Sequence, residues 1–222
     1  MFMVNTFMVN TLPFLQYGVG GHGKVVWDAA CSTGLRVDLV ADDNLRIVEF
    51  EGLKVIHPSW SGDMGLPPAY EFLVAVGDNA ARAELFKCLL RAGGKPRTVC
   101  HRFSVVSRTA TIGSGTLICA GAVVNPEASV GVNCVLNTAS SVDHDCRVGD
   151  HAHLCPGVRL GGTVCVGEGA MLGLGAVVLP GVSIGAWSVI GAGAVVLRDL
   201  PPRGVAYGNP AHVARILPQP AP

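Results

Sequence analysis

A six-residue hydrophobic repeat runs through the second half of the chain. From Val106 to Val196, sixteen positions in steps of six are all Ile, Leu or Val, with no slip in register. Four residues after each of them stands Ala, Ser, Thr, Cys or Val, until Leu200 ends the series. The residue directly after the aliphatic one is Gly, Asn or Asp in eleven of the sixteen repeats, and these types tolerate the positive φ of a tight turn. Each hexad therefore predicts one short strand and one turn, with the aliphatic side chain pointing inward.

Hexads of this kind stack into a solenoid. Three of them close one triangular coil, so residues 105–200 predict about five coils, each covering the hydrophobic face of the next. The expected fold class of this half is an all-β parallel β-helix.

The residues before the repeat follow a different pattern. Segments 14–17, 36–40 and 71–76 are predicted strands, and helices are expected over 24–32 and from residue 80 to about residue 92. Alternating strands and helices predict a small parallel α/β domain. We therefore divide the chain into a leader (1–12), an α/β domain (13–104), the β-helix (105–200) and a closing segment (201–222).

A glycine-rich turn joins the first predicted strand to the first predicted helix. Gly18, Gly20 and Gly23 have the spacing of the Rossmann dinucleotide fingerprint, and acidic Asp42 follows about twenty residues later. The domain has room for one mononucleotide-binding half but not for a nicotinamide half, which argues against NAD. Glycines at a helix N-terminus favour a phosphate group, so a nucleotide diphosphate is the expected ligand. A tight turn without any ligand is the alternative.

Composition and charge exclude several classes of protein. The formal net charge is zero and no basic patch is visible, so neither nucleic acid nor an anionic membrane is an expected partner. No apolar run is long enough to span a bilayer. The eight cysteines form no Cys-x-x-Cys pair, and the duplicated leader lacks an export signal. We expect free thiols, no structural zinc and a cytoplasmic location.

Three features together resemble one family of enzymes. They are Gly18–Val26 (GVGGHGKVV), Val76–Asn79 (VGDN) and the hexads. In these features, residues 13 to about 215 resemble the nucleotide-4-amino-sugar N-acetyltransferases, the PglD- and PerB-like group. This group is related to the NeuD-type sialic acid O-acetyltransferases. The resemblance implies a left-handed β-helix, a homotrimer with active sites between neighbouring solenoids, and a role in surface polysaccharide biosynthesis. It also implies acetyl-CoA as cosubstrate, a nucleotide-diphosphate amino sugar as acceptor, and no metal.

The same resemblance implies roles for single residues. His144 would be the general base, Asp145 would orient it, and His153 would contact acetyl-CoA. The family often has Glu where Asp145 stands, which changes the reach of the carboxylate by one methylene. The other implied positions are Gly20, Gly21, His22, Asp42, Asp43 and Gly77 for the nucleotide sugar, and Gly162, Leu174 and Ala192 for CoA.

The residue types at the centre of this set fit the chemistry. A histidine titrates near neutrality and accepts a proton from an attacking amine, and a carboxylate on its other ring nitrogen fixes the tautomer. Cys146, two residues away, falls on the small inward slot of its hexad. It is therefore expected to pack in the core rather than to form an acyl-cysteine.

Other functions stay open on the sequence alone. His144 could be a solvated surface histidine, or a metal ligand with His151 and His153, although no matching Cys or carboxylate set accompanies them. O-acetylation of a sialic acid or related sugar is one rival function, and a non-catalytic nucleotide-sugar-binding trimer is another. A carbonic anhydrase built on a β-helix would need three zinc-binding histidines and would leave the α/β domain unexplained. Neither the nucleotide base nor the sugar epimer follows from the sequence.

Overall fold

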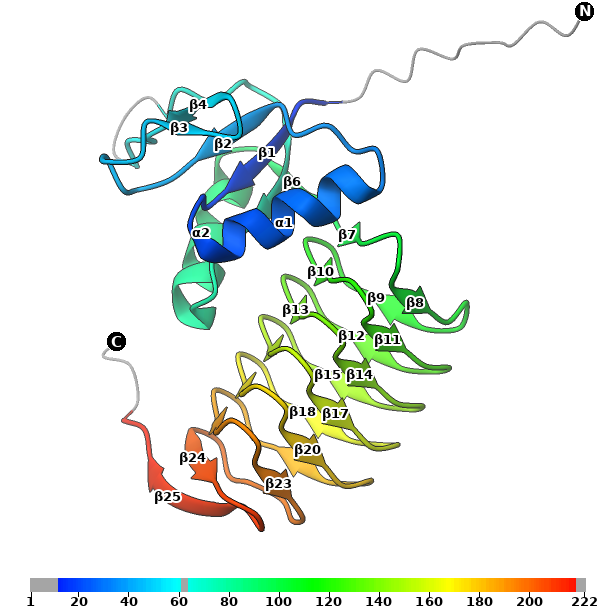
Figure 1. The fold of residues 1–222 in the computed structure, drawn as a ribbon. Helices are drawn as coiled ribbons and strands as arrows, with labels where there is room; N and C mark the ends of the chain where they lie inside the picture. Colours follow the sequence, from blue (N-terminus) through cyan, green and yellow to red (C-terminus); the bar gives the residue numbers. More distant parts are fainter. Residues whose placement is uncertain (1–11, 61–63, 219–222) are drawn as a thin grey trace, which may run out of the picture.

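The computed structural model describes residues 12–60 and 64–218. An α/β domain sits on one end of a long solenoid, and a hairpin closes the other end (Figure 1). The expected fold class, an α/β domain followed by a left-handed parallel β-helix, is confirmed. The duplicated leader, predicted over residues 1–12, lies outside the described residues except for Leu12.

The α/β domain is built on a six-stranded sheet in the order β3-β4-β2-β1-β5-β6. All neighbours are parallel except β3, which pairs antiparallel with β4 at the edge. The short strands β3, β4 and β6 were not expected from the sequence. The strands are β1 (Phe14–Tyr17), β2 (Leu39–Ala41), β3 (Glu49–Phe50), β4 (Leu53–Ile56), β5 (Glu71–Val74) and β6 (Lys95–Pro96), and the helices are α1 (Gly21–Ser32) and α2 (Asn79–Arg91).

The solenoid has three faces, each a parallel sheet of two-residue strands. The first face comprises β7 (Val99–Cys100), β10 (Leu117–Ile118), β13 (Val135–Leu136), β16 (His153–Leu154), β19 (Met171–Leu172) and β22 (Val189–Ile190). The second face comprises β8 (Val105–Val106), β11 (Val123–Val124), β14 (Ser141–Val142), β17 (Arg159–Leu160), β20 (Val177–Val178) and β23 (Val195–Val196). The third face comprises β9 (Thr111–Ile112), β12 (Ser129–Val130), β15 (Arg147–Val148), β18 (Cys165–Val166) and β21 (Ser183–Ile184).

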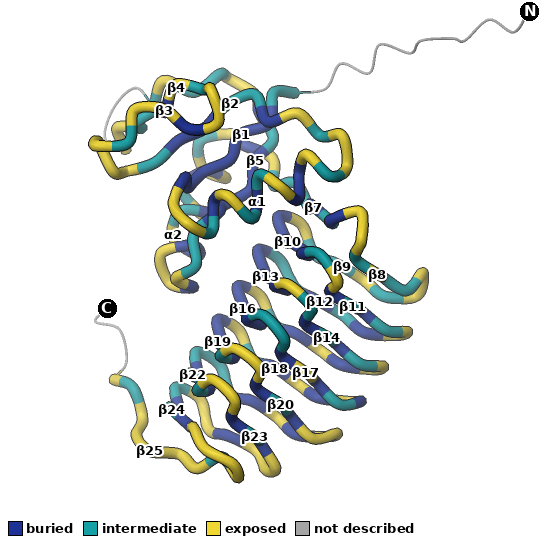
Figure 2. The backbone as a smooth tube through the Cα atoms, in the orientation of Figure 1, coloured by how far each residue is buried: buried dark blue, intermediate teal, exposed yellow. Residues whose placement is uncertain are grey.

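The register between coils equals three hexads. Leu117 pairs with Val135, and Val135 pairs with His153, in steps of eighteen residues. The repeated aliphatic side chains line one continuous core with the small corner residues, and Figure 2 shows buried and exposed stretches alternating along each coil. Because β7 adds a strand before the predicted start at residue 105, the solenoid begins earlier and has slightly more coils than the five expected.

The reason for the repeated glycines differs from the sequence-based expectation. Positive φ occurs three residues after the aliphatic position, as at Glu127, Asp145 and Gly175, and not directly after it. The glycines directly after the aliphatic residue have another role. A Cβ on Gly113 would lie 2.4 Å from the backbone of Gly131 in the next coil, and one on Gly167 would lie 2.5 Å from Ala186 N. Close approach of successive coils, rather than a left-handed backbone, therefore requires glycine there.

The C-terminal segment closes the solenoid. β24 (Gly204–Tyr207) continues the first face in parallel with β22, and β25 (His212–Ile216) pairs antiparallel with β24. The turn between them contains a cis Asn209–Pro210 bond. β25 is therefore the edge strand of this sheet, and its antiparallel pairing ends the parallel stacking of the coils.

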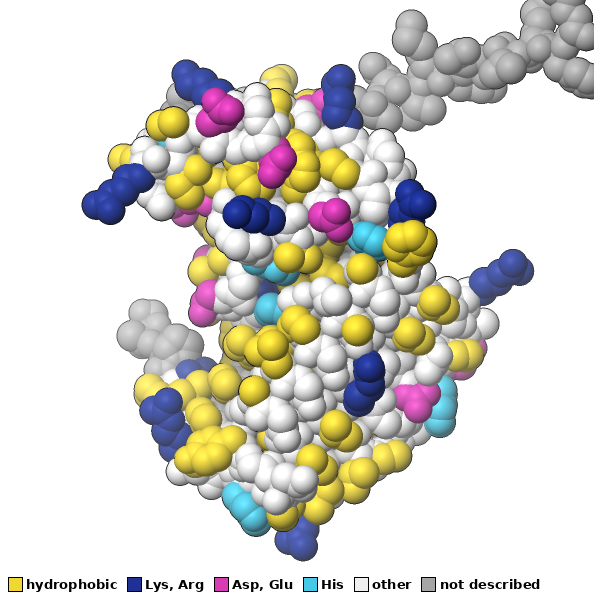
Figure 3. All heavy atoms as spheres, in the orientation of Figure 1, with side chains coloured by type: hydrophobic (Ala, Val, Ile, Leu, Met, Phe, Trp, Pro, Cys, Tyr) yellow, Lys and Arg dark blue, Asp and Glu magenta, His cyan; other side chains and the backbone are white. Residues whose placement is uncertain are grey.

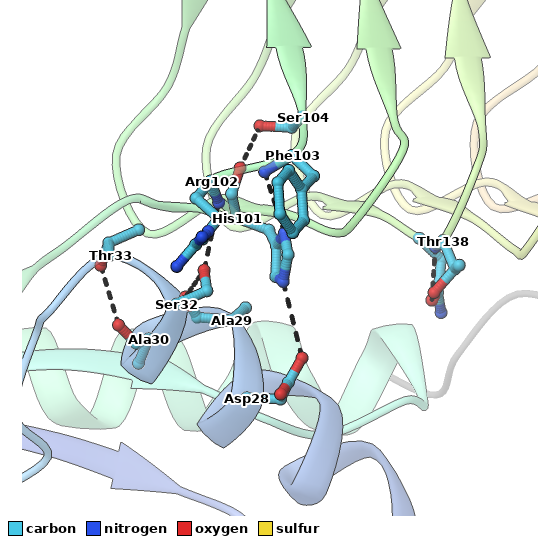
Figure 4. Close-up of polar contacts among 11 residues, drawn as sticks. Asp28, Ala29, Ala30, Ser32, Thr33, His101, Arg102, Phe103, Ser104 and Thr138 are labelled. Carbon is cyan, nitrogen blue, oxygen red and sulfur yellow. Dashed lines mark hydrogen bonds and ion pairs between the residues drawn. The ribbon is translucent and has the colours of Figure 1, made fainter.

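The α/β domain packs against the first face. Val26, Ala29 and Ala30 of α1 share one buried cluster with the outward side chains Leu117 and Val135. Polar contacts border this cluster (Figure 4): His101 Nε2 lies 3.6 Å from Asp28 Oδ2, and the Arg102 N–H donates to Ser32 Oγ at 3.1 Å. The glycine turn at the start of α1 is thus held at a fixed position over the solenoid.

Neither α1 nor α2, the two helices of the described residues, is long and apolar enough to cross a membrane. On the face drawn in Figure 3, the Lys and Arg side chains of the described residues are distributed over the surface, and several lie beside Asp or Glu side chains.

Candidate active site

His144 lies on a turn of the second corner, the edge where the second face meets the third. The turn leads from β14 to β15, and its shape is fixed by its own side chains and backbone. Asp143 Oδ1 accepts hydrogen bonds from the His144 N–H and from Asn125 Nδ2 in the preceding coil, both at 2.8 Å. Asp145 takes the left-handed conformation with φ 59°, and the next coil donates the Thr163 N–H to the His144 carbonyl at 2.9 Å.

The imidazole of His144 forms a pair with the carboxylate of Asp145. The distance between Nδ1 and Oδ2 is 2.7 Å, and the two side chains are 58% and 55% exposed. The hydrogen bond from His144 Nδ1–H to the Asp145 carboxylate is the main cause that raises the pKa of His144 above its ordinary value, and the nearby charge of Asp143 adds to it. With Nδ1–H donated to the carboxylate, Nε2 carries the free lone pair. An exposed histidine arranged in this way is able to accept a proton from a bound nucleophile.

Cys146 has no part in this pair. Its side chain is fully buried, and its Sγ–H donates to the carbonyl of Gly161 at 3.1 Å. Burial raises the pKa of the thiol above its ordinary value. The expectation that this cysteine packs inward is confirmed.

The glycine turn leads from β1 into α1. A Cβ on Gly18 would lie 2.6 Å from the Ala75 carbonyl oxygen, and one on Gly23 would lie 2.5 Å from the Gly18 carbonyl oxygen. These two glycines therefore allow the close packing of strand, turn and helix. Gly20 and Gly21 instead face open space, as does Gly77 after β5, and no side chain caps the N-terminus of α1. Free amides at an open helix N-terminus form a suitable site for a phosphate.

The acidic pair after β2 already has partners within the domain. Asp42 accepts hydrogen bonds from the backbone N–H groups of Val19 and Asn44, at 2.9 and 2.8 Å. Asp43 accepts one from the Tyr17 hydroxyl at 2.6 Å and one from the Trp60 indole at 3.3 Å. Asp42 thus ties the glycine turn to β2, and Asp43 holds an aromatic pair at the same edge.

His22 and His153 meet where the α/β domain contacts the solenoid. Their ring centroids lie 5.9 Å apart. His153 Nδ1 donates to the Gly77 carbonyl at 3.3 Å, and its Nε2 accepts from the Asn137 side-chain amide at 3.1 Å. Burial, followed by the charge of Arg82, lowers the pKa of both imidazoles to about 4. Both rings are therefore neutral at pH 7.

Arg82 is the residue that the sequence analysis missed. Its side chain is fully buried, and the guanidinium donates to the backbone carbonyls of Asn133, Val76, Gly77 and His151. It thereby fastens α2 and the Gly77 turn to the third corner, the edge where the third face meets the first. No sequence signal marks it, because an arginine on a helix is usually solvated.

The other implied residues lie on two different corners. Leu174 and Ala192 stand on the first corner, between the first and second faces, one coil apart. Gly162 stands on the second corner, one coil after His144, and lies directly against its imidazole. Within one chain the structure brings together His144, Asp145 and Gly162, and separately groups His22, Gly77 and His153. Among the described residues, no group of three or more His, Cys, Asp or Glu side chains is arranged to hold a metal ion.

Comparisons with known proteins agree with this architecture. Residues 15–89 match the family profile of the PglD N-terminal domain. The UDP-N-acetylbacillosamine N-acetyltransferase of Bacillus subtilis (strain 168) is 39% identical over 108 residues, which make up 46% of this chain. The matched region is 49% of that protein, so the chain spans about half the length of this curated relative.

The similarity to solved structures covers more of the chain. PerB from Caulobacter crescentus, in complex with CoA and GDP-perosamine, has a TM-score of 0.84 and 36% identity, covering 91% of this chain and 97% of that one. The acetyltransferase domain of PglB from Neisseria gonorrhoeae, in complex with acetyl coenzyme A, has a TM-score of 0.83 and 31% identity, covering 91% and 99%. With such identity over 91% of its length, the chain belongs to the PglD- and PerB-like family of nucleotide-sugar N-acetyltransferases built on a left-handed β-helix.

Proposed function

We propose that the protein is an acetyl-CoA-dependent N-acetyltransferase that acts on the amine of a nucleotide-linked 4-amino-4,6-dideoxy sugar. The observation that carries this proposal is the exposed His144–Asp145 pair on a corner of the β-helix, with Nδ1 to Oδ2 at 2.7 Å. A histidine whose pKa is raised by a carboxylate is typical of catalytic sites, which favours an enzyme over a non-catalytic binding protein. Family membership supports the same reaction, because the PglB domain has been solved with acetyl coenzyme A and PerB with CoA and GDP-perosamine.

The proposed chemistry is direct transfer within a ternary complex. The amine attacks the acetyl carbonyl of the thioester, and His144 Nε2 takes a proton from the nitrogen as the N–C bond forms. The tetrahedral intermediate then collapses, the C–S bond breaks, and CoA leaves as the thiolate. Asp145 keeps the imidazole in the correct tautomer and stabilises its protonated form. A cysteine intermediate is unnecessary, and Cys146 is buried with a raised thiol pKa.

The remaining residues are proposed to bind the two substrates. The open amides at Gly20 and Gly21 suit the diphosphate, and His22, Asp42, Asp43 and Gly77 border the same end of the sheet. His153, neutral and buried against Gly77, is proposed to meet acetyl-CoA where the α/β domain joins the solenoid. Gly162, Leu174 and Ala192 complete the proposed CoA contacts.

A homotrimer is part of this proposal. His144 lies on the second corner, whereas the glycine turn packs over the first face of the same chain. A site that contains both His144 and the glycine turn therefore requires the second corner of one protomer to lie beside the α/β domain of another. We also propose a cytoplasmic location, supported by the eight cysteines, all of which are free.

The test is the release of CoA thiol from acetyl-CoA with a panel of UDP-, dTDP- and GDP-linked 4-amino sugars, and with free sialic acid. We expect turnover with one amino sugar. His144→Ala should lower kcat roughly 10²- to 10⁴-fold, the usual worth of a general base. The matched control is His212→Ala, which removes another exposed histidine from β25 and should leave turnover unchanged.

Two outcomes would change the conclusion. Turnover of sialic acid alone would replace the amine by a hydroxyl acceptor and make the protein an O-acetyltransferase. Failure of every acceptor, with the fold intact by circular dichroism, would remove the proposed reaction.

A further inference from the structure

Gly162 stands at a turn position that does not otherwise require glycine. Each hexad has a slot two residues after its inward aliphatic side chain, and there are sixteen such slots between residues 108 and 198. Fifteen of them carry a side chain, including alanine at 120, 186 and 192, and Gly162 is the single glycine. Its φ is not in the positive region. Neither the conformation of the turn nor its place in the repeat therefore explains this glycine.

The neighbour in the preceding coil explains it. His144 occupies the same slot eighteen residues earlier, and the two turns are joined by the hydrogen bond from Thr163 N–H to the His144 carbonyl, at 2.9 Å. A Cβ at position 162 would lie 2.5 Å from His144 Nε2, 2.6 Å from Cε1 and 3.2 Å from Cδ2. These three atoms are the nearest to that point, and all belong to the imidazole. The ring thus fills the space that a side chain at 162 would take.

We infer that Gly162 is a positioning residue for the general base, in an argument that rests on the proposed role of His144. Because Gly162 has no side chain, the imidazole of His144 is able to lie over the next coil while its Nδ1 remains hydrogen-bonded to Asp145. Any side chain at 162 has to turn the ring away and thereby break the contact between Nδ1 and Asp145 Oδ2. This role differs from the CoA contact that the family resemblance implies for the same residue.

A side chain at position 162 should impair catalysis without lowering the stability of the fold. The atoms that collide with a Cβ at 162 are the far end of an exposed side chain, which is free to rotate away. The φ of Gly162 is not in the positive region, and alanine tolerates negative φ values in the α and β regions as well as glycine does. Gly162→Ala should therefore fold normally and still misplace its base.

The experiment compares Gly162→Ala with the wild type and with Ala186→Gly. The control makes the reverse exchange in the same slot of another turn, where no catalytic side chain is proposed. We expect unchanged thermal unfolding for both variants. For Gly162→Ala we expect kcat to fall on the order of tenfold to a hundredfold, with unchanged KM for the sugar, whether or not the KM for acetyl-CoA also changes.

A second readout needs no substrate. An NMR titration of the His144 ring should show its pKa falling toward the ordinary value in Gly162→Ala, because the Asp145 hydrogen bond that raises it is lost. The charged groups that act on this ring are Asp143 and Asp145, and both remain in the variant. The titration tests the inference even if the proposed acetyl transfer fails.

Three results would overturn the inference. A higher KM for acetyl-CoA, with kcat and the His144 pKa unchanged, would make Gly162 a CoA contact only. An unchanged pKa together with unchanged kinetics would mean that the ring tolerates a Cβ beneath it. Loss of folding would show that the clash is not confined to the side chain of His144.

Discussion

Asp145 contacts His144, although the family resemblance implies that a glutamate, longer by one methylene, often stands at this position. The left-handed backbone of Asp145, with φ 59°, brings its carboxylate to 2.7 Å from His144 Nδ1. The same left-handed conformation recurs at the corresponding position of the neighbouring turns, as at Glu127 and Thr163. At the scale of single residues, the turn conformation and the short side chain of Asp145 are thus compatible with the contact to His144.

The first prediction concerns the charge of this carboxylate. Since the Asp145 hydrogen bond raises the pKa of His144, kcat/KM should rise with pH as the raised pKa is passed and the base loses its proton. Asp145→Asn should move that midpoint to lower pH, because a neutral amide no longer stabilises the imidazolium. We also expect kcat to fall on the order of tenfold to a hundredfold.

A pH–rate profile from pH 5 to 9 measures both effects. The control is Glu127→Gln, which removes a carboxylate from the same slot one coil earlier, where φ is also positive. A midpoint that stays in place in Asp145→Asn would show that the carboxylate does not set the pKa of the base.

The second prediction concerns Cys146. Alanine already occupies the same slot at positions 128 and 152, so Cys146→Ala should fold and keep its kcat. Intact-protein mass spectrometry after incubation with acetyl-CoA should detect no acetyl group on either protein. An acetylated wild type, together with an inactive Cys146→Ala, would establish a covalent intermediate instead.

At the scale of elements, the repeat predicted the strands of the solenoid but not the reason for its glycines. The period of six and the inward aliphatic positions follow directly from the sequence, because they are set by the core. The glycines after the aliphatic positions depend on the spacing between coils, which no single hexad reveals. Strands β3, β4 and β6 were missed because they are short: β4 and β6 pair with the distant strands β2 and β5, and β3 has two residues and pairs only with β4.

The contact between the α/β domain and the solenoid leads to the third prediction. His22 and His153 are neutral in the folded protein, with pKa values lowered to about 4, whereas an exposed histidine titrates near 6.5. Below pH 6.5 the unfolded chain therefore binds protons that the folded chain does not, and the free energy of unfolding falls as the pH falls toward 4. A shift of this size corresponds to roughly 3 kcal/mol per histidine.

Urea unfolding at pH 7, 6, 5 and 4 measures this loss. His153→Gln should be less sensitive to pH over the range, whatever its stability at pH 7. His212→Gln, at an exposed position on β25, should keep the slope of the wild type. An unchanged slope in His153→Gln would mean that folding does not change the pKa of this ring.

At the scale of the whole molecule, the candidate site falls into two parts that one chain does not join. The family resemblance proposed His144, Asp145 and His153 as site residues, and the spacing of the glycines indicated the turn before α1, because each of these rests on a short stretch of sequence. The sequence could not show that the base sits on the second corner while the glycine turn packs over the first face. It also gave no sign of Arg82, whose carbonyl partners come from three separate segments.

The last prediction tests whether two chains share one site. His144→Ala removes the base but leaves the nucleotide pocket. Gly21→Glu places a carboxylate at the open N-terminus of α1, where it should repel a diphosphate without a clash, since nothing lies within 4 Å of the added Cβ. Each variant alone should be inactive.

Mixed trimers should recover activity if each site takes its base from one protomer and its pocket from the next. In an equal mixture, half of the protomers supply an intact base and half an intact pocket, so about a quarter of the sites are complete. Joint refolding of the two variants, followed by the thiol-release assay, should therefore give about a quarter of the wild-type rate, whereas the proteins mixed without refolding should give none. Sites contained within a single chain would recover nothing in either case, because no chain in the mixture has both an intact base and an intact pocket.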